Sequence, residues 1–277
     1  MSSTLPKAPD HPFKMLQPKT RKLSSILPGD VSTYPQNTVI TKYARLSHIP
    51  SMGLGLTATQ DLPAGTTWYL ATVDNYLPIP KRTFTAIRQA GKRNPEWEIF
   101  KKSIEIYSVY SERWDTVNFS LDNLRFLNHG IVERGQKEED EQQQEEDGMG
   151  NVDIGGTAVT EDTMVGWSAW TTRDVKEGEQ LVFNYLQFKD CPWANGCKRF
   201  LMPDGDEEID FEALDKETAC EEGTSNVEIL LTREQLGVYV DSGLERDIDK
   251  ALMMVIAKWG VWDEGRGVLV IKVPFEV

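Results

Sequence analysis

Two short stretches hold the residues whose types and spacing could do chemistry. The first, RFLNHG at residues 125–130, ends an extended run in an amide, Asn128, and an imidazole, His129. The second, GEQLVFNY at residues 178–185, alternates in a way that predicts a strand after a turn at its glycine. Tyr185 ends the apolar face of that strand with a hydroxyl, which needs a hydrogen-bond partner or a chemical role. Together the two stretches indicate a single site.

These residues carry a resemblance to a known family. RFLNHG and GEQLVFNY are similar to the paired signature of the SET-domain protein-lysine methyltransferases, whose usual forms are R-F-x-N-H-S and G-E-E-L-x-F-D-Y. A third stretch, GLGLTATQDLPAG at residues 53–65, resembles the strand pair that opens the family's domain. All three occur in the family's order over roughly residues 41–190, which is more specific than any one motif alone. The sequence departs from the pattern at Gly130, where Ser is usual, at Asn184, where Asp is usual, and in a long acidic insertion after His129.

The resemblance implies a mostly β (α+β) fold of the SET β-clip type, with the two signature stretches threaded as a pseudoknot. It implies methyl transfer from S-adenosylmethionine to a lysine of a basic protein or peptide, with a histone tail as the leading expectation. Tyr185 would be the catalytic residue. The expected cofactor-binding residues are Gly53, Leu54, Gly55, Arg125, Phe126, Asn128 and His129, and the expected substrate channel contains Phe183, Tyr107 and Trp193.

Each of these interpretations has a plainer alternative. His129 could be a hydrogen-bonded core histidine, and a lone G-x-G such as residues 53–55 is often only a turn. Tyr107 could belong to the core or the surface instead of a channel. The whole domain could also be a catalytically silent SET-like module, which holds basic tails through its acidic segments.

The net charge of −14 belongs to two segments. Residues 133–150 contain eight acidic and two basic residues, and residues 204–228 contain eleven acidic and one basic residue. The rest of the chain is therefore close to neutral. The absence of a basic stripe argues against direct binding of nucleic acid, whereas a basic peptide partner suits this charge.

Hydropathy and cysteine usage limit where in the cell the protein is expected. No apolar run approaches the ~20 residues of a membrane span, and the first residues lack the apolar centre of a signal peptide. The three cysteines, Cys191, Cys197 and Cys220, do not suggest a disulfide framework and are fewer than the four ligands of a structural zinc site. We therefore expect an intracellular protein, in nucleus or cytoplasm, that binds no membrane and no metal.

Several elements must position the site residues. Apolar spacing predicts helices at residues 82–91 and 95–104, and alternation predicts strands at 39–43, 104–110 and 163–171. The corner TQDLPAG at residues 59–65 has an echo, TRDVKEG, at residues 172–178, so two similar hairpin-like corners are expected. Thr232 and Gln235 form a capping box that predicts a short helix, followed by a helix at 244–258 and a strand at 267–273.

The same signals divide the chain into parts. Residues 1–38 are expected to form a flexible or loosely docked arm, and residues 39–203 the SET-like domain, with 133–150 as a disordered acidic insertion. Residues 204–228 form an acidic linker and residues 229–277 a C-terminal appendage. The apolar face of the appendage should pack on the main domain or make a homodimer.

Overall fold

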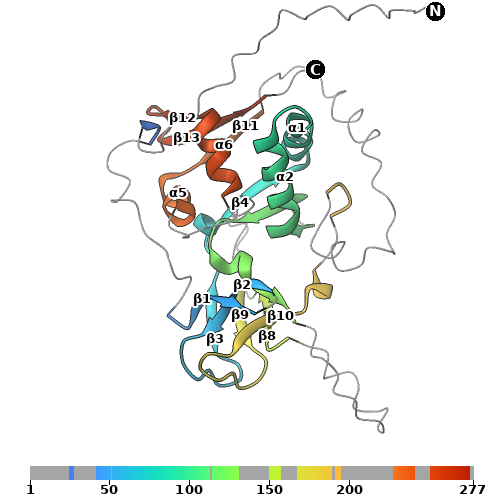
Figure 1. Cartoon of the computed structure of the whole chain (residues 1–277), viewed down its shortest axis with the longest axis vertical. Helices are drawn as coiled ribbons and strands as arrows, with labels where there is room; N and C mark the ends of the chain where they lie inside the picture. Colours follow the sequence, from blue (N-terminus) through green and yellow to red (C-terminus); the bar gives the residue numbers. More distant parts are fainter. Residues whose placement is uncertain are drawn as a thin grey trace, which may run out of the picture.

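The strands and helices of this chain gather into two parts, each with its own hydrophobic core (Figure 1). The computed structural model describes residues 25–27, 42–50, 52–112, 114–130, 150–156, 167–188, 191–194, 227–240 and 250–274. Within these ranges the fold is mixed α+β, with four helices and several small sheets. The knotted threading implied by the family resemblance stays a prediction.

The first part consists of two small sheets. One sheet has the order β1-β2-β10-β7 and the other the order β3-β9-β8. Its core contains fully buried aromatic and aliphatic side chains, among them Trp68, Leu56 and Leu181. The strands are β1 (Ala44–Ile49), β2 (Gly53–Ala58), β3 (Thr67–Leu70), β7 (Asn128–His129), β8 (Val152–Gly156), β9 (Trp167–Thr171) and β10 (Gln180–Phe183).

The two corners with similar sequences interlock. The Asp61 carboxylate accepts a hydrogen bond from the N–H of Glu177, and the Asp174 carboxylate accepts one from the N–H of Ala64, both at 2.9 Å. Each aspartate thus binds the residue three positions after its counterpart, so the corners are related by an approximate two-fold axis. The same reciprocity holds for the backbone, where Leu62 pairs with Val175, and Gly65 and Gly178 have φ values of 77° and 79°.

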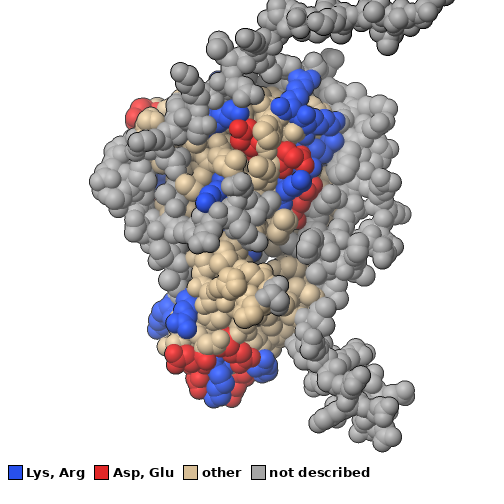
Figure 2. Space-filling model, viewed as in Figure 1, with Lys and Arg blue, Asp and Glu red and all other residues tan. Residues whose placement is uncertain are grey.

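Charged side chains gather around these corners. Lys176 lies 2.9 Å from Asp61, and Arg173 lies 2.6 Å from Glu179. Figure 2 shows this mixed cluster at the tip of the first part, separated by uncharged surface from a second group of charges over the helices. Because these ion pairs are exposed, we assign the corners' stability mainly to the backbone bonds.

The second part is built on the sheet β4-β6-β5 and two helices. The helix α1 (Lys81–Gly91) starts after Pro80, and α2 (Pro95–Tyr107) starts with proline at its first position, which suits the fixed φ of that residue. Phe84, Ile87 and Phe100 are fully buried, as the apolar spacing predicts. The strands are β4 (Tyr76–Pro80), β5 (Ser108–Ser111) and β6 (Thr116–Ser120), joined to the first part by the 3-10 turns η3 (Val73–Asn75) and η4 (Asn123–Phe126).

The C-terminal elements pack on this second part. The capping box is confirmed, since the Gln235 N–H donates to the Thr232 hydroxyl at 3.1 Å and the Thr232 N–H to the Gln235 carboxamide at 2.9 Å. The Gln235 amide also donates to the Tyr76 carbonyl at 2.8 Å, and Lys258 pairs with Glu96 at 2.8 Å. The elements are β11 (Val227–Leu231), α5 (Arg233–Val240), α6 (Ala251–Trp259), β12 (Gly260–Asp263) and β13 (Val268–Val273).

Some expected elements have different limits. The predicted strand at 104–110 is wrong in its first half, because α2 continues to Tyr107 and keeps Ile104 in the core before β5 begins at Ser108. The first strand begins at Ala44 instead of ending at Tyr43, which lies in a turn. The helix α6 begins at Ala251, and residues 241–249 lie outside the described ranges.

Several predictions fall on residues outside the described ranges. These include most of the N-terminal arm, although Ile26 and Leu27 are buried in the core of the second part. The insertion is described only at Gly150, and the acidic linker only from residue 227. Of the described helices, none combines the length and apolar character that crossing a membrane requires.

Candidate functional site

The three stretches singled out in the sequence meet in one sheet. Strand β10 runs antiparallel to β2, with Leu181 opposite Leu56, and parallel to β7, with Phe183 opposite His129. The strand that leads to Tyr185 therefore lies between the glycine-containing hairpin and the Asn-His pair. Segments that are far apart in the chain thus form one continuous surface around the end of β10.

Tyr185 lies just beyond β10, in the 3-10 turn η5 (Tyr185–Gln187), so it does not extend the strand's apolar row as its spacing predicted. Its N–H donates to Nδ1 of His129 at 3.0 Å, and its hydroxyl donates to the Leu127 carbonyl. Burial lowers the pKa of His129, with a smaller opposing effect from the Phe183 backbone. A neutral imidazole can accept at Nδ1, so the lowered pKa and the bond to Tyr185 agree.

Asn128 links the Asn-His pair to the glycine-containing hairpin. Its carboxamide donates to the Leu54 carbonyl at 3.1 Å. A Cβ atom at Gly55 would lie 2.8 Å from that carboxamide nitrogen and 2.5 Å from Cγ1 of Ile49. Gly53 has a φ of 84°, a backbone conformation that glycine adopts without strain. The G-x-G is therefore needed for close packing against Asn128, which a simple turn would not require.

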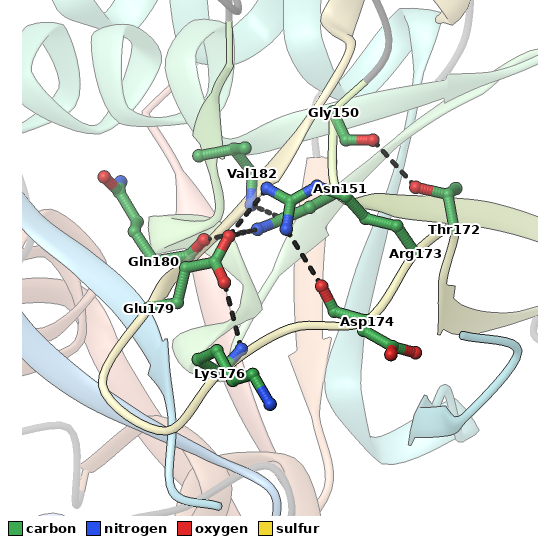
Figure 3. A network of polar contacts seen from close by, with 9 residues as sticks. All are labelled: Gly150, Asn151, Thr172, Arg173, Asp174, Lys176, Glu179, Gln180 and Val182. Atoms are coloured by element: carbon green, nitrogen blue, oxygen red, sulfur yellow. Dashed lines mark hydrogen bonds and ion pairs between the residues drawn. The ribbon is translucent and has the colours of Figure 1, made fainter. Parts of the chain in front are cut away.

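Asn151, which the sequence analysis did not single out, binds the backbone of β10 (Figure 3). Its carboxamide accepts from the N–H of Val182 at 2.9 Å and donates to the Gln180 carbonyl at 2.7 Å and to Glu179 at 3.2 Å. Only 3% of Asn151 is exposed. One side chain therefore bonds two backbone groups of β10, a donor and an acceptor, on either side of Leu181.

The insertion leaves and rejoins the domain beside Val182. A Cβ at Gly130 would lie 2.4 Å from Cγ2 of Val182, and a Cβ at Gly150 would lie 2.3 Å from the Val182 carbonyl oxygen. Glycine at 130 in place of the usual serine is thus a packing requirement in this chain. The Gly150 carbonyl also accepts from the Thr172 hydroxyl at 3.0 Å (Figure 3).

A narrow cavity of about 40 Å³ lies at the junction of the two parts, next to Tyr185. Its lining comes from the second part at one end and from the first part at the other. Most of the lining is apolar, and hydroxyl groups interrupt it. The lining residues are Tyr76, Ile106, Tyr107, Ser108, Val109, Ser120, Leu124, Arg125, Leu127, Ile154, Tyr185 and Phe188.

Of the three expected channel residues, the structure brings only Tyr107 to this cavity, together with the expected catalytic residue. Tyr107 and Tyr185 line it. Phe183 lies behind it, buried between Tyr185 and Phe188 with ring centroids 6.4 and 4.8 Å away. Trp193 is elsewhere, in the core of the second part, where its indole donates to Asp115 at 2.7 Å. An aromatic residue type in the sequence does not by itself tell whether the side chain lines the cavity or lies in a core.

Arg125 and Phe126, for which cofactor binding stays a prediction, support the cavity wall. The Arg125 guanidinium donates to the carbonyls of Leu121 and Asp122 at 2.6 and 3.0 Å and lies over the Phe126 ring. Phe126 in turn packs edge-on against Tyr107, with ring centroids 5.8 Å apart. Both side chains thereby fix the turn η4 that precedes Asn128.

The residues expected to hold S-adenosylmethionine form a surface of half-buried backbone and amide groups. Gly53, Leu54, Asn128 and His129 are all partly accessible, and a side chain at position 55 would clash with Asn128. Such a surface fits a ligand held by backbone contacts. Among the described residues, no group of three or more His, Cys, Asp or Glu side chains is placed so that it could hold a metal ion, and Cys197 and Cys220 lie outside the described ranges.

Comparison with known proteins adds the following. No family model matches the chain, and no curated protein matches it in sequence. A candidate histone methyltransferase of Plasmodium falciparum is similar in structure, with a TM-score of 0.30 and 9% identity over 53% of this chain and 95% of that one. A Polycomb Repressive Complex 2 structure from Chaetomium thermophilum, bound to GSK126, has a TM-score of 0.33 and 14% identity over 76% of this chain.

A further structure of that complex, autoinhibited and bound to S-adenosylmethionine, also has a TM-score of 0.33 and 14% identity, over 79% of this chain. This chain spans only 25% and 26% of the two Chaetomium chains. Likenesses at these TM-scores assign neither a family nor an activity. The functional argument therefore rests on the motifs and on the site geometry.

Proposed function

We propose that this chain is a protein-lysine N-methyltransferase that uses S-adenosylmethionine. The observation that carries the proposal is the position of Tyr185, which lines a narrow, mostly apolar cavity directly beside the sheet that unites the three motif stretches. The order and spacing of the motifs resemble the SET-domain family, and the geometry supports their acting as one site.

The cavity suits the end of a lysine side chain. Lysine in water has a pKa near 10.4 and is almost entirely charged at neutral pH, whereas methyl transfer needs the neutral amine. Apolar surroundings disfavour the charged form and lower the pKa of an amine that enters them. Because the lining is mostly apolar, an amine that enters the cavity would displace water from around its nitrogen.

Tyr185 is fixed well enough to orient that amine. Its backbone is held by His129 and its hydroxyl by the Leu127 carbonyl, so the lone pairs of the phenol oxygen have a defined direction. The backbone of 53–55, with Asn128 and His129, would hold the cofactor on the neighbouring surface. When bound, S-adenosylmethionine would supply a methyl group activated by its sulfonium.

The substrate that we propose is a basic protein segment, with a histone tail as the leading class. The support is the strongly acidic balance of the chain, which attracts basic partners. The alternative of a silent module that holds basic tails depends on the acidic segments, and no contact of the described residues favours it.

The proposal is tested with isotopically labelled S-adenosylmethionine and a panel of basic proteins, followed by identification of the labelled residue by mass spectrometry. We expect label on lysine nitrogen in at least one protein. A chain that binds both cofactor and basic tails but transfers no methyl group would refute the enzyme and support the silent module.

A further inference from the structure

A buried carboxyl group lies immediately behind the cavity. Asp122 is only 1% exposed and sits between β6 and the turn η4. One carboxylate oxygen accepts from the Leu124 N–H at 3.0 Å and from the Ser120 hydroxyl at 3.1 Å. The other accepts from the Tyr69 hydroxyl at 3.0 Å. The bond from the Leu124 N–H caps the turn. The bonds from the Ser120 and Tyr69 hydroxyls are not needed for capping.

Ser120 connects this carboxyl group to the cavity. Ser120 lines the cavity together with Tyr185, and its hydroxyl donates to Asp122. Tyr76 also lines the cavity, and its hydroxyl lies 3.5 Å from that of Tyr69, which bonds the other carboxylate oxygen. The apolar cavity therefore has one polar wall, and a carboxyl group stands directly behind it.

The proposed reaction needs a proton acceptor at this place. A lysine enters from water mostly as ammonium and must lose a proton before its nitrogen can attack. The Tyr185 hydroxyl already donates to Leu127, and the Arg125 guanidinium does not accept protons. Ser120 lines the cavity and its hydroxyl bonds directly to the Asp122 carboxylate, whereas Tyr76 reaches that carboxylate only through Tyr69.

We propose a proton relay in which Asp122 accepts, through Ser120, the proton that the substrate ammonium loses before methyl transfer. This inference rests on the proposed function. An N–H bond of the ammonium breaks as its proton moves to the Ser120 oxygen. The hydroxyl proton of Ser120 moves to the Asp122 carboxylate, leaving a neutral amine and a neutral carboxylic acid. The proton returns to water by the reverse route once the product has left the cavity.

The surroundings of Asp122 suit this role. Burial raises the pKa of Asp122, while the bonds from Leu124, Tyr69 and Ser120 and the nearby Arg125 charge lower it. The titratable and charged groups that face it are Tyr69 on β3, Tyr76 on β4 and Arg125 on η4. The pKa values of both tyrosines are raised by burial and by this carboxylate, so they stay neutral as Asp122 titrates.

The first test compares pH profiles of kcat. Ser120→Ala cuts the link and leaves Asp122 its bonds to Tyr69 and Leu124. We expect kcat at neutral pH to fall by about 10²-fold, as for removal of a general base. We also expect the wild-type plateau above the Asp122 pKa to be replaced by a rate that keeps rising with pH. Ser120→Thr keeps the hydroxyl and should restore the plateau.

Ser103→Ala is the matched control, because Ser103 is a buried serine on α2 that does not line the cavity. It should keep the wild-type profile. An unchanged plateau in Ser120→Ala, with methyl transfer intact, would overturn the relay while leaving the proposed function standing. A loss of rate with the plateau preserved would also overturn it, since that pattern marks a packing role.

The second test needs no turnover. Carboxyl-carbon NMR of the full chain labelled at aspartate follows Asp122, assigned from its absence in Asp122→Asn, while n-butylammonium chloride is added at constant pH. We expect the Asp122 signal to move towards the protonated form in the wild type and not in Ser120→Ala. An unchanged Asp122 signal with the amine bound would overturn the relay. If the wild type protonates Asp122 but transfers no methyl group, the proposed function fails and the proton acceptor stands.

Discussion

At the scale of single residues, His129 makes the position of Tyr185 sensitive to acid. Its Nδ1 accepts from the Tyr185 N–H, and burial lowers its pKa below the usual histidine value of 6.5. Because the folded pKa lies below the unfolded one, the neutral form contributes stability that is fully present above pH 6.5. That contribution is lost as pH falls through the folded pKa, when a proton occupies the accepting nitrogen.

We therefore predict that the free energy of unfolding falls as the pH is lowered from 6.5, more steeply in the wild type than in His129→Asn. Asparagine offers an oxygen near the place of Nδ1 and does not titrate. Urea titrations at a series of pH values measure the difference between the two proteins. Parallel stability curves for both would show that His129 is not coupled to folding in this range.

The role of the Tyr185 hydroxyl can be tested by removing its oxygen atom. In Tyr185→Phe the ring keeps its contacts with His129 and Phe188, so the fold should be retained. We predict that kcat falls by about 10²–10³-fold, as for loss of one preorganised hydrogen-bonding group, while cofactor affinity changes little. Steady-state kinetics and calorimetry with the cofactor product measure the two effects.

Tyr110→Phe is the matched control for that substitution. Tyr110 lies on β5 near the cavity but does not line it, and its hydroxyl donates to Asp115 at 2.9 Å. It should keep close to full activity. An equal loss of kcat in both variants would mean that a general disturbance of packing, and not the Tyr185 hydroxyl, accounts for the change.

At the scale of elements, the backbone of the short strand β10 depends in part on a side chain. The Asn151 carboxamide pairs with both the Gln180 carbonyl and the Val182 N–H. We predict that Asn151→Ala lowers the free energy of unfolding by about 2–4 kcal/mol, because two backbone groups lose their partner in a partly buried place.

Asn151→Asp separates the two bonds, since a carboxylate still accepts from Val182 but cannot donate to Gln180 and repels Glu179. It should be at least as destabilising as alanine at neutral pH. Asn118→Ala, which removes a carboxamide that contacts the Thr116 hydroxyl on β6, serves as control. Urea unfolding measures the stability of the three variants. A loss of less than about 0.5 kcal/mol in the free energy of unfolding of Asn151→Ala would contradict the proposed support of the β10 backbone by Asn151.

The elements that the sequence predicted well are those with strong local signals. Period-3.6 spacing marked α1 and α2, and the capping box marked the start of α5. The boundary between α2 and β5 was missed because Ile104 and Tyr107 satisfy both a helical and an alternating pattern. The role of Asn151 was missed because it depends on the backbone of a strand about 30 residues away, which no local pattern encodes.

At the scale of the whole molecule, the cavity exists because two separate cores meet. Tyr185, Leu127 and Ile154 come from the first part, and Tyr107 and Val109 come from the second. The C-terminal elements brace this junction through the bond from Gln235 to the Tyr76 carbonyl. The sequence located the Tyr185 end of the site and one residue of the opposite wall, Tyr107. The rest of that wall follows from long-range packing, which no local pattern encodes.

The acidic insertion after His129 can be shortened to test whether the fold depends on it. Both of its ends lie on the same residue, since Gly130 and Gly150 each pack against Val182. Replacing residues 133–149 by a short Gly-Ser bridge should therefore leave the site in place, because shortening a loop whose ends stay together changes closure entropy only slightly. We predict a change in Tm of less than about 4 °C, or ~1–2 kcal/mol for a chain of this size.

Extending the deletion to Gly150 and Asn151 should lower the stability several times more, because it removes the bonds to Thr172 and to β10. Calorimetry of the two deletions gives the comparison, and equal losses would show that the insertion itself packs against the domain.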